Sequence, residues 1–178
     1  RRIINRMKPL DTIEKAFAQS LGAQHSVRLI GGFDEPLYLP ATDSRAAEIR
    51  FRSDYPSSAL HEVAHWCLAG EHRRALEDYG YWYEADRSAT AQRAFESVEA
   101  RPQALEWVFS RAVGCAFRVS ADNLSIGIAE QFREMIRAEA RLFTVKMPQD
   151  GLRFARALVK LTGHQDFLST DHYLELPQ

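Results

Sequence analysis

Two histidines placed four residues apart constrain this chain more than any other feature. His61 and His65 bracket a glutamate in the stretch LHEVAHWCLAGEH, which begins at Leu60. On an α-helix, residues four apart lie one above the other, so both imidazoles point to the same side and can bind one cation. Glu62 lies about 100° further round the helix, where it can contact a metal-bound water. The spacing therefore predicts a helix that carries two metal ligands, in preference to a pair of surface histidines without an ion.

The segments around this helix predict a mixture of helices and strands. Apolar spacing predicts an N-terminal helix over residues 9–21, and three β-like runs cover residues 26–30, 36–40 and 47–52. Pro56 opens the histidine helix, which we expect to end near Gly70. Further helices are expected over residues 89–98, from Pro102 to about 115, over 126–143 and over 151–161, with an irregular tail. The order predicts one α+β domain over residues 1–178, a small antiparallel sheet packed on a mainly helical body, with the His-Glu-x-x-His helix resembling that of zincin peptidases.

The composition restricts the classes of partner. Of 178 residues, 46% are apolar and 26% charged, close to an ordinary globular domain. The formal net charge of −1 gives no overall electrostatic case for nucleic acid or membrane binding, and no apolar run approaches the roughly 20 residues that span a bilayer. Cys67 and Cys115 are too few for a disulfide scaffold, and we expect reduced thiols in a cytoplasmic protein.

A third metal ligand must come from outside the histidine pair. His72 is seven residues beyond His65, roughly 10 Å along a continuous helix, which is too far to share an ion. Glu106 is the favoured candidate, because a carboxylate within the apolar stretch LEWVF is costly to bury unless a cation compensates it. Glu99 is the second candidate. The alternative for Glu106 is a solvated glutamate in the first turn of a helix that begins at Pro102.

Two histidines and a carboxylate describe both a hydrolytic zinc site and the iron site of non-haem oxygenases. In a peptidase, Glu62 is the general base on the zinc-bound water, whereas in an iron hydroxylase it acts by hydrogen bonding beside the ligands. A metal that only stabilises the fold is a third possibility. The metzincin pattern is disfavoured, because Leu68 and Glu71 stand where it requires glycine and histidine.

Two other features are open to a functional interpretation. His164 and Asp166 have the His-x-Asp form of jelly-roll oxygenases, but no series of strands accompanies them, and we favour a polar tail. Aromatic residues cluster at Tyr79, Tyr81, Trp82 and Tyr83, where they either dock a partner or pack a loop against a helix.

Three stretches together resemble the elongation factor P hydroxylase family. They are HEVAHWCLAGEHRRALEDYGYWYEADR, EARPQALEWVF and VSADNLS, between about residues 57 and 125. The resemblance implies a bacterial, cytoplasmic enzyme that hydroxylates the lysine of elongation factor P already carrying a β-lysyl group. It also implies a mononuclear site with two histidines and a carboxylate, which maps onto His61 and His65, with Glu106 as the inferred match.

On this resemblance we expect a non-haem hydroxylase with Fe(II) as its metal, although zinc or another divalent ion can occupy such a site. The sequence shows no recognisable co-substrate motif. The resemblance implies a folded, acidic protein as the partner, so we expect a docking rim formed by Arg73 with the aromatic residues Tyr79, Tyr81, Trp82 and Tyr83. The alternative is a zincin-like metallopeptidase that uses His61, His65 and Glu62.

Overall fold

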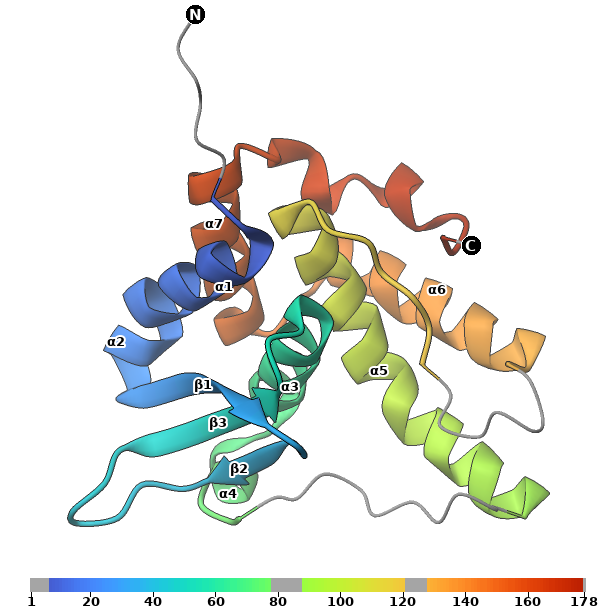
Figure 1. The fold of residues 1–178 in the computed structure, drawn as a ribbon. Coiled ribbons are helices and arrows are strands. Elements are labelled where there is room, and N and C mark those ends of the chain that lie inside the picture. Colours follow the sequence, from blue (N-terminus) through green and yellow to red (C-terminus); the bar gives the residue numbers. More distant parts are fainter. Residues whose placement is uncertain (1–6, 78–87, 121–127, 178) are drawn as a thin grey trace, which may run out of the picture.

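A long helix, α5 (Ala89–Val113), forms the axis of the helical part of the molecule (Figure 1). The computed structural model describes residues 7–77, 88–120 and 128–177. Helices α3 (Pro56–Leu68), α6 (Glu130–Val145) and α7 (Gln149–Thr162) all contact α5. The apolar face of each helix is buried against its neighbours, so that α5 supplies the central row of core side chains.

The N-terminal helical segment is longer than its sequence pattern predicts. α1 (Pro9–Phe17) continues through a π-helical stretch, η1 (Ala18–Gly22), into the short α2 (Ala23–His25). Ile13, Phe17 and Leu21 are buried, at the four-residue spacing of an amphipathic helix. The segment packs on α7, which closes one side of the core.

The sheet is mixed, which corrects the expectation of an antiparallel one. Its strands β1 (Val27–Phe33), β2 (Leu37–Leu39) and β3 (Ala47–Arg52) lie in the order β1-β3-β2. β2 and β3 are antiparallel, whereas β1 and β3 are parallel, with Val27 opposite Ala47. The expectation was wrong for β1 because the chain turns after β1 to reach the far edge and turns again to return to the middle. Two reversals leave β1 and β3 pointing the same way.

α3 lies between the sheet and α5 (Figure 1), and it contacts both. Pro56 occupies its first turn. Backbone N–H groups in a first turn have no acceptor within the helix, so the missing N–H of proline costs no hydrogen bond there. Leu60, Val63 and Ala64 are fully buried, which fixes the rotation of the helix about its axis. After α3 the chain turns through Gly70 into the four-residue helix α4 (Glu71–Arg74).

α5 is one continuous helix, although the sequence predicts two that divide at Pro102. The Ser88 hydroxyl accepts a hydrogen bond from the backbone N–H of Ala91 at the start, and Gly114 ends the helix with a φ of 81°. Pro102 lies inside it, at the cost of one backbone hydrogen bond. Burial of Leu105, Trp107 and neighbouring side chains on three surrounding helices outweighs that loss.

The C-terminal segment packs on the helical body through two 3-10 turns, η2 (Gln165–Leu168) and η3 (Thr170–Tyr173). Tyr173 is fully buried, with its ring centroid 5.0 Å from that of Trp107. The α+β class predicted from the sequence is confirmed. In the described ranges, no helix has both the length and the apolar character needed to cross a membrane.

Candidate metal centre

The two histidines of α3 present their Nε2 atoms to one point, as their spacing predicts. The Nε2 atoms of His61 and His65 are 3.0 Å apart. Both side chains are partly exposed, because they lie on the face of α3 that lines a cavity, opposite the buried apolar face. The helix therefore holds two imidazole donors close together at the wall of a solvent-accessible space.

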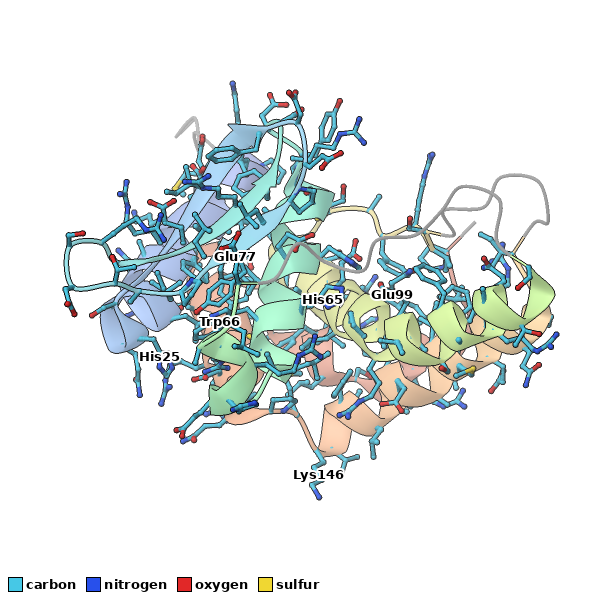
Figure 2. All side chains as sticks on the ribbon, turned by 90° about the horizontal axis from the view of Figure 1, so that it is seen from below. His25, His65, Trp66, Glu77, Glu99 and Lys146 are labelled. Atoms are coloured by element: carbon cyan, nitrogen blue, oxygen red, sulfur yellow. The ribbon has the colours of Figure 1, made fainter. Side chains whose placement is uncertain are left out.

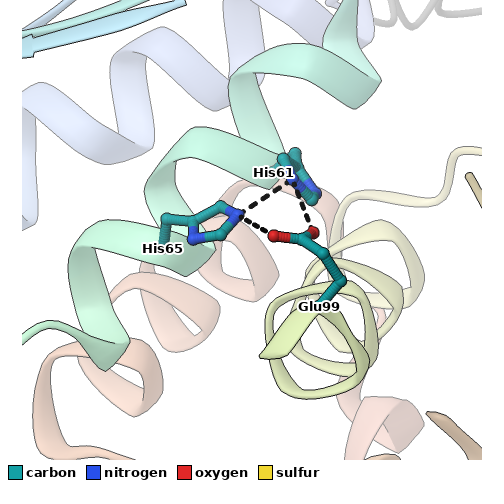
Figure 3. Close-up of side chains that lie close together, drawn as sticks. All are labelled: His61, His65 and Glu99. Atoms are coloured by element: carbon teal, nitrogen blue, oxygen red, sulfur yellow. Dashed lines mark hydrogen bonds and ion pairs between the residues drawn. The ribbon is translucent and has the colours of Figure 1, made fainter. Parts of the chain in front are cut away.

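Glu99 of α5 supplies a carboxylate to the same point. Its Oε2 lies 3.5 Å from Nε2 of His61, and its Oε1 lies 3.3 Å from Nε2 of His65. Figure 3 shows the carboxylate facing both rings across the α3–α5 contact. In the described part of the chain, these three residues are the group whose donor atoms converge as metal ligands do.

The donor set fits a divalent transition metal. Nitrogens about 2.1 Å from one ion and bound at roughly a right angle are separated by about 3.0 Å, which matches the distance between the two Nε2 atoms. Glu99 is 5% exposed, so its carboxylate needs a cationic partner. Two neutral imidazoles and one carboxylate form a ligand set for iron or zinc that leaves further coordination positions open.

Glu106 lies behind His61 and does not join this group of donors. Its Oε2 is 2.9 Å from Nδ1 of His61, the ring nitrogen directed away from the shared point. This is the carboxylate–histidine arrangement in which Nδ1–H donates to an acid and Nε2 is left free to bind a metal. The structure therefore brings both candidate carboxylates to the histidines, Glu99 on the converging side and Glu106 on the far side of His61.

Burial and charge act in opposite directions on this pair. Burial raises the pKa of Glu106, although the hydrogen bond to His61 partly offsets it. Burial lowers the pKa of His61, but the hydrogen bond and charge of Glu106, together with the charges of Glu62 and Glu99, hold it above its usual value. Surplus negative charge around His61 therefore favours a bound cation, either a proton or a metal ion.

The continuity of α5 places both carboxylates on one side. Glu99, Gln103 and Glu106 follow each other at spacings of four and three residues, so they lie on one face of the helix. All three are at least 95% buried, and all three line the cavity beside α3. Gln103 received no role from the sequence, and the signal that identifies it is this spacing along an unbroken helix.

The cavity in front of the histidines has a volume of about 920 Å³. Its walls come from the sheet, α3, α4, α5 and the segment after α5. Glu62 and Arg73, both singled out from the sequence, line it. Tyr79, Tyr81, Trp82 and Tyr83 lie outside the described residues. The arrangement places a candidate metal-ligand group in the wall of a space large enough for an extended side chain.

A second cluster supports the cavity wall formed by Trp66. The Arg74 guanidinium lies 3.6 Å from the centroid of the Trp66 ring, and its Nε donates to the Trp66 carbonyl. The same guanidinium donates to Asp150 of α7, whose other oxygen lies 2.9 Å from Nε2 of His25. In Figure 2, Trp66 and His25 lie together on the side of α3 away from Glu99. No sequence pattern predicts that these residues meet, because they come from four separate segments.

The remaining histidine candidates lie elsewhere. His72, on α4, is exposed and is not among the residues that line the cavity. The carboxylate of Asp166 accepts a hydrogen bond from His172, and the ring of His164 lies against Gly114.

Comparison with known proteins identifies relatives of this chain. The model of the family described as elongation factor P hydroxylase matches residues 16–173. The elongation factor P lysine hydroxylase of Haemophilus influenzae is 42% identical over 162 residues, which cover 88% of this chain and 91% of that protein. The range matched by the family model contains His61, His65, Glu99 and Glu106.

Proposed function

This chain belongs to the elongation factor P hydroxylase family, and we propose that it hydroxylates a lysine of elongation factor P with a metal ion held by His61, His65 and Glu99. The observation that carries the proposal is the convergence of these three side chains on one point at the cavity wall. The related protein from Haemophilus influenzae is named for this reaction. Neither comparison names a peptidase, so the zincin alternative has no support.

Iron is the metal that suits this reaction. Zinc has no redox chemistry, whereas hydroxylation of a carbon atom is an oxidation, so a redox-active ion is required. Bound Fe(II) supplies the oxygen chemistry, and the protein supplies ligation, substrate placement and a shaped cavity. Glu106 has the position of a residue that holds His61 in the tautomer with a free Nε2. This division between Glu99 and Glu106 replaces the preference for Glu106 as the ligand.

The cavity supports a substrate side chain that enters from another protein. Its volume of about 920 Å³ accommodates a long aliphatic chain, including a lysine extended by a β-lysyl group, the form expected from the family. Glu62 lines the cavity beside the ligands, where its carboxylate can bind an ammonium group of such a chain. Reaction on a protein of the translation apparatus is also the reason to propose a cytoplasmic location.

Docking of the partner is proposed at the rim of the cavity. Arg52, Arg73 and Arg118 line it from β3, α4 and the segment after α5, and all three are exposed. Guanidinium groups so placed suit an acidic partner whose lysine reaches inward. The proposed contribution of Tyr79, Tyr81, Trp82 and Tyr83 to the same rim stays a prediction from the sequence.

The decisive experiment measures the mass of β-lysylated elongation factor P after incubation with the iron-loaded protein, dioxygen and a chemical reductant. A gain of one oxygen is expected, with loss of that gain in His61→Ala. His72→Ala is the matched control, because His72 is exposed and lies outside the cavity, and it should retain full activity. Hydroxylation that persists in His61→Ala would exclude the proposed site. Proteolysis abolished by Glu62→Gln, without any gain of oxygen, would support the peptidase instead.

A further inference from the structure

The segment after α5 forms a wall of the cavity without belonging to a helix or a strand. Past Gly114 the chain runs back beside α5 (Figure 1), and Ala116, Arg118, Val119 and Ser120 line the cavity. Between them, the buried ring of Phe117 stacks on Trp107, with centroids 5.5 Å apart and planes 13° from parallel. The stacked ring of Phe117 therefore attaches the wall to α5.

A second attachment comes from Gln103. Its side-chain nitrogen donates to the Ser120 carbonyl at 2.7 Å, and its side-chain oxygen accepts from the Ser120 N–H at 2.9 Å. The side-chain amide thus both donates to and accepts from the backbone of Ser120, as the backbone of a neighbouring strand does. These are the hydrogen bonds that the structure gives between residues 116–120 and the rest of the described chain.

The position of Gln103 links this wall to the metal ligands. Gln103 is 1% exposed and lies one turn from Glu99 and one from Glu106 on the same face of α5. A buried amide that forms two bonds is costly to leave unpaired, so the wall is held at a fixed distance from the helix that supplies the carboxylate. A displaced wall changes the width of the cavity that Glu99 also lines.

We propose that Gln103 is a positioning residue that holds residues 115–120 in place as the substrate-contacting wall of the cavity. The inference rests on the proposed function for the identity of the substrate. On that function, the side chain held between this wall and α3 is the modified lysine. Gln103 itself neither binds the metal nor holds a metal ligand. Its effect is therefore expected on substrate affinity and not on the metal site.

The test replaces Gln103 by leucine, which has a similar size but no hydrogen-bonding groups. Binding of β-lysylated elongation factor P to the metal-loaded protein should weaken about tenfold, as expected for the loss of one or two buried hydrogen bonds. Metal affinity and kcat should stay within about twofold of the wild type. Phe117→Leu, which weakens the other attachment of the wall, should show the same pattern, whereas Gln149→Leu on the exposed start of α7 should have no effect.

Amide hydrogen exchange provides a readout that is independent of activity. In Gln103→Leu, the peptide that covers residues 115–120 should exchange faster, while peptides from α3 and α6 keep their wild-type protection. Unchanged exchange in this peptide, or faster exchange with unchanged substrate binding, would overturn the inference. So would a loss of metal affinity in parallel with substrate affinity, because Gln103 would then serve the ligands. A wild-type protein that hydroxylates nothing would refute the proposed function, while the exchange and binding measurements would still decide the role of the wall.

Discussion

Glu99 and Glu106 are both buried carboxylates at His61, and the atoms that they face assign them different tasks. Glu99 faces Nε2 of both histidines, whereas Glu106 faces Nδ1 of His61. A residue that binds an ion directly contributes more to its affinity than one that orients a ligand. The order of their effects on metal binding is therefore a test at the scale of single residues.

We expect Glu99→Gln to lower the affinity for Fe(II) by more than about 100-fold, and Glu106→Gln by about 10- to 100-fold. Titration of the metal-free variants with Fe(II), or with Co(II) as a spectroscopic substitute, measures both. Glu96→Gln is a matched control, because Glu96 is buried on the same helix but is not among the residues that line the cavity. A larger loss of metal affinity in Glu106→Gln than in Glu99→Gln would indicate that Glu106 is the ligand.

The sequence predicted the histidine pair and favoured Glu106 over Glu99 as the third ligand, whereas in the structure Glu99 is the carboxylate that lies with both Nε2 atoms. The four-residue spacing of His61 and His65 is local, and any helix places them on one side. Which histidine atoms the carboxylates of Glu99 and Glu106 face depends on the rotation of α5 relative to α3. The packing of both helices determines that rotation. The apolar neighbours of Glu106 correctly predicted its burial, and they contain no information on which imidazole nitrogen it meets.

At the scale of elements, the main departure from the sequence pattern is the continuity of α5 through Pro102. Proline is a local signal for a helix end, and here the gain from packing along α3, α6 and α7 exceeds its cost. Continuity is required by the proposed site, because a break at Pro102 would separate Glu99 from Gln103 and Glu106. The three β-like segments were located correctly, but their connection through the far edge of the sheet has no local signature.

β1 packs so closely on β3 that one glycine is required between them. A Cβ atom on Gly31 would lie 2.5 Å from the Phe51 ring and 2.8 Å from the Ser53 carbonyl oxygen. We expect Gly31→Ala to lower the free energy of unfolding by about 1–3 kcal/mol, measured by denaturant titration. Gly70→Ala is the control, because nothing lies within 4 Å of its added Cβ. Equal stability of the two variants would contradict the packing described for β1.

At the scale of the whole molecule, Asp150 connects segments that are distant in the sequence. Its carboxylate accepts hydrogen bonds from Arg74 of α4 and Arg153 of α7, and it pairs with His25 of α2. Partial burial raises the pKa of Asp150, but the bonds from His25 and Arg74 outweigh burial and hold it below its usual value. A group with a lowered pKa stabilises the fold above its unfolded-state pKa, and this contribution is lost as the pH falls through the folded value.

Asp150→Asn should therefore lower the free energy of unfolding by about 1–2 kcal/mol at neutral pH. The difference between variant and wild type should remain constant down to about pH 5 and shrink below about pH 4, because the wild-type carboxyl then becomes protonated. Urea titrations at several pH values measure it. Asp171→Asn on the exposed turn η3 provides the control. A difference that grows on acidification would contradict the assigned ion pairs.

The distribution of charge around the cavity leads to a prediction about association with the partner. The interior contains the carboxylates of Glu62, Glu99 and Glu106, whereas the rim carries exposed arginines, among them Arg118. A cationic side chain that projects from an acidic surface complements both regions at once.

We expect Arg118→Glu to slow association with elongation factor P about tenfold at low salt, with little change in metal affinity. Since exposed charges are screened within about 10 Å at 0.1 M salt, the difference should shrink as the ionic strength rises. Stopped-flow measurements over a range of salt concentrations test this, with Arg156→Glu on the exposed face of α7 as a charge-matched control. Equal slowing by both variants would show that net charge, rather than the rim, governs the encounter.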